Sequence, residues 1–369
     1  MTLSRLGARL SSIARIVLLI AAGGLVGLSI LPLFDSDAWW VRYPTFPALQ
    51  IAAAMVVVAV LLMLWRGWSG WIGIVGLLAG IAIQADRLSP YLAPAVFSRP
   101  APTVPGGSCA PQDRVRVLEV NVQRTNRHDH ALLDMIRAIN PDIVWFQEVN
   151  GWWEKELSAL QETLPYDVAD VQENYFGVHL YSKLKLSDTS VQDLTNSNDP
   201  SVFATATLAS GRRLRLYAIH PRPPLIGQST AERDGQLAAT ALAAHDDILP
   251  HVVLGDLNSV PWAAEIARLK GIGRVEDPRV GRGLFVTWNA ERTLAKWPLD
   301  HILPGPGIVL SSMRVMPAFG SDHMPLLADL CMSGTPGIPR PLDPAVRASA
   351  DAAVARGQGK ALGPNATRP

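Results

Sequence analysis

Three long runs without a charged residue dominate the first quarter of the chain. They extend from Ile16 to Phe34, from Tyr43 to Trp65 and from Gly67 to Ala85, and contain 19, 23 and 19 residues. An α-helix needs about 20 apolar residues to cross the hydrocarbon core of a bilayer. Three such runs, separated by only a few polar residues, are hard to place inside a globular core. The sequence therefore predicts three transmembrane helices over these ranges.

A cleaved signal peptide is the alternative explanation of the first run. No small-residue cleavage site follows Phe34, and two further apolar runs come after it. The prediction is therefore a multi-pass membrane protein that contacts the lipid bilayer through its N-terminal helices.

The arginines around the three runs indicate an orientation. Lys and Arg are enriched on the cytoplasmic side of membrane proteins. The side of the N-terminus has the larger number, because Arg5, Arg9, Arg15 and Arg66 oppose Arg42, Arg87 and Arg99. We expect a cytoplasmic N-terminus and, after three spans, an extracytoplasmic location for everything beyond Ala85.

Composition divides the rest of the chain after a membrane region at 1–89. Residues 90–111 contain six prolines, together with Gly106 and Gly107, and are expected to form a semi-rigid linker. Residues 112–333 have the composition of one folded domain. Residues 334–369 are rich in Pro, Ala, Gly and Arg, and we expect a disordered tail with at most a short helix near 345–355.

The folded domain is acidic. Between Pro111 and Ser333 there are 21 Lys and Arg against 27 Asp and Glu, a net charge of −6, and there is no basic run. This excludes a polycationic nucleic-acid binder, although catalytic carboxylates would contribute to the count. The chain has two cysteines, Cys109 and Cys331, which are too few for a disulfide-built scaffold and lack the spacing of a zinc site.

Apolar patterns in the domain alternate between strand and helix. The spacing from Ala131 to Ile139 is helical and stops at Asn140-Pro141, while Ser229 to Glu232 has the pattern of a capping box that opens a helix to about Asp246. Short apolar or alternating runs predict strands near 115–121, 143–146, 202–208, 214–219, 251–254, 299–303, 313–316 and 326–330. The pattern predicts an α/β sandwich of about 220 residues.

Polar side chains follow several of the predicted strands. Asn121, Glu148, His220 and the pair Asp256 and Asn258 each end an apolar run. Taken singly they have plain structural readings, such as a turn residue at Asn121 or an Asx turn at 256–258. Because strand ends gather at one edge of a sheet, together they indicate a site.

Taken in order, these motifs resemble the endonuclease/exonuclease/phosphatase superfamily. That superfamily includes pancreatic deoxyribonuclease, abasic-site endonucleases, inositol polyphosphate 5-phosphatases and neutral sphingomyelinases. The resemblance covers roughly Arg114 to Leu330 and lies in Asn121, Gln147-Glu148, His220-Pro221, Gly255-Asp256-Leu257-Asn258, Leu299-Asp300-His301 and Gly320-Ser321-Asp322-His323. It implies a four-layered α/β sandwich, in which two packed β-sheets are flanked by helices, in a membrane-anchored, bacterial-type member.

The resemblance also implies a divalent cation, Mg²⁺ or Mn²⁺, which neutralises phosphoester charge through oxygen ligands. Glu148 is the leading metal ligand, Asn121 holds phosphate or metal beside it, and Asp322 closes the metal site. Gln123 departs from the Asp that abasic-site endonucleases tend to have at this position, which weakens any two-metal assignment.

In the same resemblance His323 is the base that activates the attacking water, and Asp300 fixes its tautomer. Asp256 and Asn258 position the water or the phosphate. His220 donates to a phosphate oxygen or to the leaving oxygen, with Glu173 as the candidate for a second acid paired with it.

These assignments predict a membrane-tethered, metal-dependent phosphoester hydrolase. Its substrate is either nucleic acid or phospholipid, which the sequence leaves open, and no protein partner is inferred. The alternative is a catalytically inactive membrane sensor or scaffold that retains the fold, but a retired site usually loses one member of its set.

The resemblance further places the first and last strands of the sandwich side by side. Cys109 lies just before the first strand and Cys331 at the end of the last, so a disulfide between them is expected. Its presence would favour an oxidising compartment. The other reading is two unrelated small apolar residues.

Overall fold

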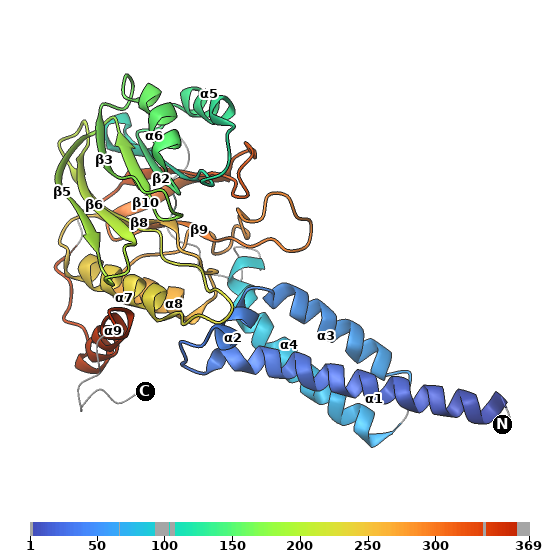
Figure 1. The fold of residues 1–369 in the computed structure, drawn as a ribbon. Helices are drawn as coiled ribbons and strands as arrows, with labels where there is room; N and C mark the ends of the chain where they lie inside the picture. The colour runs from blue at the N-terminus through green and yellow to red at the C-terminus, as the bar shows by residue number, and fades with distance from the viewer. Residues whose placement is uncertain (1–2, 66, 93–102, 104–107, 335–336, 360–369) are drawn as a thin grey trace.

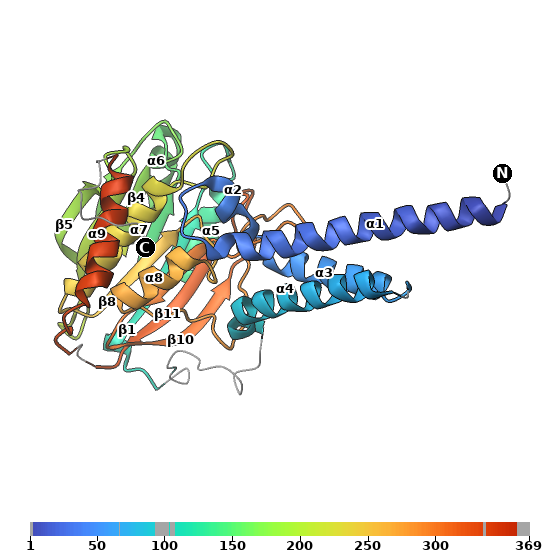
Figure 2. The ribbon, with the colours of Figure 1, turned by 90° about the horizontal axis from the view of Figure 1, so that it is seen from below.

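The computed structural model describes residues 3–65, 67–92, 103, 108–334 and 337–359. It consists of an elongated helical region at the N-terminus and an α/β domain with two β-sheets (Figures 1 and 2). The helices α1, α3 and α4 project together from one side of the domain.

Both sheets are mixed, and each contains one parallel pair of strands near its centre. The first sheet has the order β10-β11-β1-β2-β4-β3, and the second β5-β6-β7-β8-β9. Among the strand pairs of the described residues, β1/β2 and β7/β8 are parallel and the others are antiparallel. The strands are β1 (Arg114–Asn121), β2 (Ile143–Gln147), β3 (Tyr166–Asp170), β4 (Val178–Ser182), β5 (Lys185–Asp193), β6 (Pro200–Thr207), β7 (Arg213–Ala218), β8 (His251–Asp256), β9 (Asp300–Pro304), β10 (Ile308–Val315) and β11 (Leu326–Met332).

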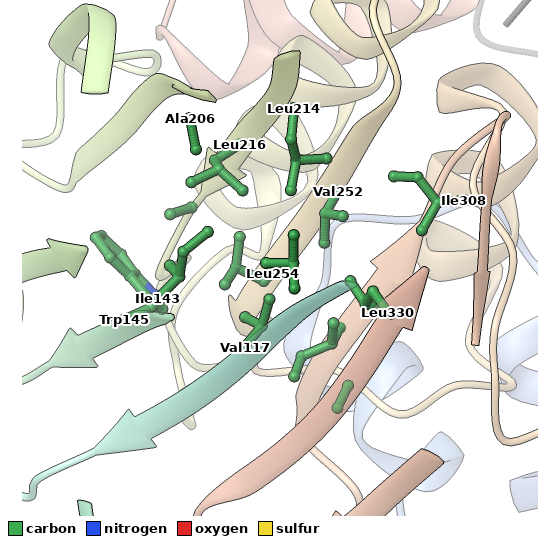
Figure 3. Close-up of a cluster of buried hydrophobic side chains, with 14 of the residues drawn as sticks. Val117, Ile143, Trp145, Ala206, Leu214, Leu216, Val252, Leu254, Ile308 and Leu330 are labelled. Carbon is green, nitrogen blue, oxygen red and sulfur yellow. The ribbon is translucent and has the colours of Figure 1, made fainter. Parts of the chain in front are cut away.

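The main hydrophobic core fills the space between the two sheets. Figure 3 shows Val117, Val252 and Leu330 among the side chains that meet there. Because side chains alternate along a strand, Leu118 and Val120 of β1 face the opposite side and join a second cluster. This alternation explains why β1 is apolar on both faces.

Helices cover the outer face of each sheet. The helices α5 (Asp129–Ile139) and α6 (Gly151–Leu157) pack through Leu132, Ile136 and Trp153 against the first sheet. The helices α7 (Ala231–Asp246) and α8 (Ala264–Gly273) cover the second. The predicted α/β arrangement, two sheets flanked by helices, is confirmed. The pattern analysis did not identify α6, α8 or the strands β3, β4 and β5.

The C-terminal segment corrects one prediction. Within the tail expected to be disordered, the short helix that the sequence allowed near 345–355 is helix α9 (Pro344–Gly357), and it packs against α7. A Cβ atom added to Gly235 of α7 would lie 2.9 Å from the Cα of Gly357, so glycine permits this close approach. Ala350 and Ala353 are buried. The Ala- and Gly-rich composition that indicated disorder instead supplies a small-residue packing face.

The N-terminal region also differs from three continuous spans. Ser11–Leu33 and Trp68–Leu92 are each long and apolar enough to cross a membrane. They contain α1 (Leu3–Ile30) with η1 (Leu31–Leu33), and α4 (Trp68–Leu92). The middle run is broken, because Trp39–Thr45, formed by α2 (Trp39–Arg42) and η2 (Tyr43–Thr45), meets α3 (Ala48–Leu62) at an angle of 75°. Pro44 and Pro47 explain the break, since proline removes a backbone donor and restricts the residue before it.

The three long helices pack tightly against one another. A Cβ atom at Gly80 of α4 would lie 2.8 Å from the Sδ atom of Met55 on α3. Met55, Leu62 and Leu77 are buried between the helices. Apolar side chains such as Val57 and Trp71 remain exposed on the outside. Small residues between helices and an apolar exterior are typical of a membrane bundle.

The interhelical segment, residues 34–47 between α1 and α3, rests directly on the α/β domain. The guanidinium of Arg42 is 3% exposed and lies 3.4 Å from Asp234 and 3.9 Å from Glu265. The indole of Trp262 donates to the carbonyl oxygen of Thr45 at 2.8 Å. The expected linker begins inside α4, which continues to Leu92, and most of residues 90–111 lie outside the described residues.

The disulfide between Cys109 and Cys331 is present, with Cα atoms 5.9 Å apart. The first strand begins beside it, because Arg114 pairs with Cys331 across β1 and β11. The expected adjacency of the terminal strands is confirmed. The bridge joins the segment that follows the helical region to the last strand of the domain.

We predict that Arg42→Ala lowers the free energy of unfolding of the domain by about 3 kcal/mol, because it leaves two buried carboxylates, Asp234 and Glu265, with Arg233 as their shared cation. The measurement is the denaturant midpoint of the full chain in detergent. Arg268→Ala is the control, since Arg268 pairs with Asp35 at 3.1 Å but is 37% exposed. It should cost less than about 1 kcal/mol. Equal losses for the two variants would contradict a buried role for Arg42.

We predict that unreduced, denatured protein from its native membrane contains no free thiol. The bridge closes a loop with a sequence separation of 222 residues. In the chain-entropy model such a loop contributes up to about 4–5 kcal/mol, so reduction should lower the unfolding midpoint. Labelling of two thiols without reductant would show that the bridge does not form.

Candidate active site

The candidate site lies where the central strands of both sheets end. Asn121 and Gln147 are register partners at the ends of the parallel strands β1 and β2. In the other sheet Asp256, at the end of β8, pairs with Asp300, at the start of β9. A hydrogen bond from the Asn121 amide to Asp256, at 3.2 Å, joins the first sheet to the second at this point. The strand ends therefore meet, as the sequence indicated.

Asn121 positions two carboxylates. Its Nδ2 donates to Oε1 of Glu148 at 3.1 Å as well as to Oδ2 of Asp256. Its Oδ1 accepts from the backbone N–H of Gln123 at 2.9 Å, which fixes the direction of the amide. Asn121 thus presents its donor side to the site and aligns the predicted metal ligand with Asp256.

Glu148 follows β2 with a left-handed backbone, φ 61°. Its second carboxylate oxygen accepts from the backbone N–H of Arg124 at 3.1 Å. Burial raises the pKa of Glu148, although the hydrogen bonds from Arg124 and Asn121 oppose this shift, and the nearby charge of Asp322 adds to it. A positive charge placed beside a carboxylate held in this way stabilises its ionised form.

His323 and Asp300 form the expected pair. Nδ1 of His323 lies 2.9 Å and 3.1 Å from the two carboxylate oxygens of Asp300, and both side chains are buried. Nε2 of the same ring lies 3.5 Å from Asp256. Burial lowers the pKa of His323, but Asp300 and Asp256 outweigh it and raise the value to about 10. The ring is thereby oriented with Nε2 toward the other site residues.

Asp256 and Asn258 belong to one tight turn. Oδ1 of Asp256 accepts from the backbone N–H of Asn258 at 3.0 Å, and the Asn258 amide donates to the carbonyl of Pro221 at 2.9 Å. Burial raises the pKa of Asp256 to about 7, with the charge of His323 opposing it and that of Asp300 adding to it. The turn connects β8 to the chain that follows His220.

Steric constraints explain why glycine occupies positions 255 and 320 of the two motifs. Gly255 has φ +137°, and a Cβ atom there would lie 1.9 Å from the carbonyl oxygen of Ile219. Gly320 has φ +103°, and a Cβ atom there would lie 2.3 Å from Nδ1 of His128. Only glycine fits such backbone positions. The end of β8 and the loop before His323 therefore both depend on a glycine at these positions.

His220 is buried, with Nε2 3.7 Å from Oδ2 of Asp256. Burial, together with the charge of His323, lowers the pKa of His220 to about 3, so its ring is neutral at neutral pH. Among the described residues, no hydrogen bond links Glu173, the suggested second acid, to His220. Oε1 of Glu173 instead accepts from the backbone N–H of Gly151 at 3.0 Å. Glu173 was thus a wrong candidate, because it caps the start of α6.

Asp322 accepts a hydrogen bond from the indole of Trp288 at 3.0 Å. Its own backbone N–H donates to the side chain of Gln123 at 3.1 Å. Gln123, the residue that departs from the abasic-site pattern, therefore holds the loop that carries Asp322 and His323. Asp322 lies at the rim of the site.

The donor set fits a divalent cation. Ligand atoms of Asp256, Asp300 and His323 lie within 4.8 Å of one another, a spacing that a metal ion can bridge. Asp300 is already engaged by His323, whereas Glu148 and Asp256 share one amide donor. Carboxylate charge thus exceeds cationic charge among these side chains. Hard oxygen donors with excess negative charge suit Mg²⁺ or Mn²⁺.

One residue of the site region was not found from the sequence. Glu119 on β1 is fully buried beneath the site and interacts with Asp300 and Gln147. Burial raises its pKa well above the usual value, and the Asp300 charge adds to this shift. The sequence feature that could have revealed Glu119 is a charged residue inside an otherwise apolar strand.

The comparisons with known proteins agree with this geometry. Residues 115–323 match the model of the Endonuclease/Exonuclease/phosphatase family. Humanized TDP2 from D. rerio is similar in structure, with a TM-score of 0.51 at 17% identity, over 59% of this chain and 99% of that one. TDP2 from D. rerio complexed with single strand DNA product gives 0.51 at 16%, over 59% and 98%. No curated protein sequence matches the chain significantly.

These solved structures share the fold of the α/β domain and do not extend over the whole of this chain. The family model, by contrast, covers more than half of the chain and contains every motif from Asn121 to His323. This chain belongs to the endonuclease/exonuclease/phosphatase family.

Proposed function

We propose that the chain is a membrane-anchored, divalent-metal-dependent phosphoester hydrolase. The observation that carries this proposal is the buried pair of His323 and Asp300. The second ring nitrogen of His323, Nε2, faces Asp256, which lies beside Glu148. Members of the family are metal-dependent phosphoester hydrolases, and the full set of expected side chains is present. The presence of all of these side chains argues against a catalytically inactive sensor or scaffold.

In the proposed reaction, water attacks phosphorus. Nε2 of His323 accepts a proton from this water as the new P–O bond forms, and Asp300 stabilises the resulting imidazolium. Asp256 and Asn258 orient the water and the phosphate. The bond from phosphorus to the leaving oxygen breaks, and the neutral ring of His220 donates a hydrogen bond to the developing oxyanion. The leaving oxygen takes up a proton from solvent.

Glu148 would hold the cation, with Asp322 beside it and Asn121 aligning the carboxylate. When bound, the cation supplies Lewis-acid stabilisation of charge on the phosphoryl oxygens. His323 can accept a proton only when its ring is neutral, and positive charge held at Glu148 shifts the ring toward that form. The same charge offsets the repulsion among the buried carboxylates.

For the domain organisation we propose a membrane region at 1–89 and a hydrolase domain at 112–333. The cytoplasmic N-terminus and extracytoplasmic hydrolase domain follow from the arginine distribution. The disulfide between Cys109 and Cys331 supports this orientation, since such bridges persist in oxidising compartments.

We predict that Glu148→Ala abolishes Mg²⁺- or Mn²⁺-dependent hydrolysis of bis(p-nitrophenyl) phosphate and leaves the unfolding midpoint nearly unchanged. Removing a charged ligand forfeits most of the electrostatic stabilisation that the cation supplies. Glu154→Ala, an exposed carboxylate on α6, is the matched control. Full activity in EDTA, or in the Glu148→Ala protein, would overturn the metal assignment.

We predict that His323→Ala and Asp300→Ala each lower kcat severely and that the double variant is little worse than either one. A base and the acid that orients it act as one unit, so their effects are not additive. Hydrolysis of the same diester by the three proteins measures this. Additive losses would show that Asp300 has a separate function.

A further inference from the structure

Two loops that border the candidate site both end on the interhelical segment. The first, residues 221–229, begins directly after His220 and ends where Ser229 forms a β-bridge with Ala38. The next backbone N–H, that of Thr230, donates to the carbonyl oxygen of Asp37 at 2.8 Å. One side of the site is thereby fixed to the chain between α1 and α3.

The second loop, residues 286–299, borders the site at His323. Trp288 forms β-bridges with both Trp297 and His323, and the two indole rings stack at 5.1 Å. The ring of Phe46 lies 5.9 Å from that of Trp297, and Gln50 donates to the carbonyl oxygen of Leu294 at 2.6 Å. This loop therefore lies against the domain end of α3 (Figure 1).

These contacts set the height of the site relative to a bilayer. The first candidate span ends at Leu33, and the apolar helix α3 begins at Ala48, so the interhelical segment lies where the bundle leaves the membrane. A long flexible tether would leave that height undefined. The hydrogen bonds to Asp37 and Leu294 instead hold both loops at the level of the membrane surface.

The tips of both loops carry exposed aliphatic side chains. Leu294 is 83% exposed and Ile226 is 72% exposed, with Leu225 beside it. Two cations flank the tip of the second loop, because Arg292 and Lys296 lie two residues before and after Leu294. Aliphatic tips between basic side chains suit the boundary between acyl chains and anionic headgroups.

We infer that the site faces the bilayer surface and that its substrate is a phosphoester in the headgroup of a membrane lipid. Leu294 and Ile226 contact the acyl boundary, and Arg292 and Lys296 contact the phosphate layer. The net charge of −6 and the absence of a basic run disfavour a nucleic acid, which relies on several cationic phosphate contacts. This inference rests on the proposed hydrolase function for its chemistry, but the membrane contact can be measured separately.

The first experiment measures contact. Full-length Leu294→Cys protein, labelled with a nitrobenzoxadiazole dye, is reconstituted in phosphatidylcholine and phosphatidylglycerol vesicles that contain spin-labelled lipid. The dye should lose most of its emission. The control is Ala209→Cys in the exposed turn between β6 and β7, at the opposite end of β7 from His220, and its dye should keep its emission. Equal emission at the two positions would overturn the membrane-facing surface.

The second experiment measures substrate class with Leu294→Ser and Ile226→Ser. Both variants should hydrolyse bis(p-nitrophenyl) phosphate at the parental rate. Their release of phosphorylated headgroup or phosphate from the vesicle lipids should be at least about tenfold slower than that of the parental protein, because an aliphatic anchor is lost. Val191→Ser, which removes an exposed aliphatic residue from the edge strand β5, should change neither rate.

The outcomes separate the two proposals. If neither the diester nor lipid is hydrolysed with Mg²⁺ or Mn²⁺, the hydrolase function fails, whatever the dye reports. If the diester and single-stranded DNA are hydrolysed but lipid is not, the function stands and the lipid inference is wrong. Lipid hydrolysis that is unaffected in Leu294→Ser and Ile226→Ser would also overturn the role of the loops.

Discussion

The buried ion pairs around Arg42 tie the two parts of the molecule together. Arg42 and Arg233 share the carboxylates of Asp234 and Glu265, and all four side chains are at most 6% exposed. Charges removed from water in this way are tolerated only when each finds partners. The network therefore requires that the interhelical segment dock on α7 and α8. It also explains why α7 begins without the expected capping box, since the hydroxyl of Thr230 turns toward Asp37 and Asp234.

The same network continues to the candidate site. Arg233 donates to the carbonyl oxygen of Asn258 at 3.3 Å, and the hydroxyl of the adjacent Ser259 donates to Glu265 at 2.6 Å. The turn that presents Asp256 and Asn258 is thus supported from beneath by groups that also hold Arg42. The docking of the N-terminal helical region and the geometry of the site thus depend on one set of contacts. For a substrate at a membrane surface, the same contacts would fix both the distance of the site from that surface and the shape of the site.

Sequence patterns located the site more reliably than its surroundings. Strand ends indicated that Asn121, Glu148 and Asp256 lie close together, and the order of the family motifs added Asp300 and His323. Glu173 failed because its loop is irregular, and its position depends on the start of α6. Glu119 was overlooked because the role of a buried acid is recognisable only when its neighbours are known. The packing of helix α9 against α7 was not predicted, because small residues show little periodic contrast until a partner helix is present.

The sequence by itself determined the apolar helices, the alternation of strand and helix, the family motifs and the candidates for catalysis, since all of these are local patterns of hydrophobicity, spacing and residue type. Only the tertiary structure decided how the middle helix bends, which carboxylates receive Arg42 and where the two bordering loops end. Those features depend on charges and surfaces that lie far apart along the chain, such as Arg42 and Glu265. Their pairing is fixed by the cost of burying an unpartnered charge, which acts only once the chain has folded.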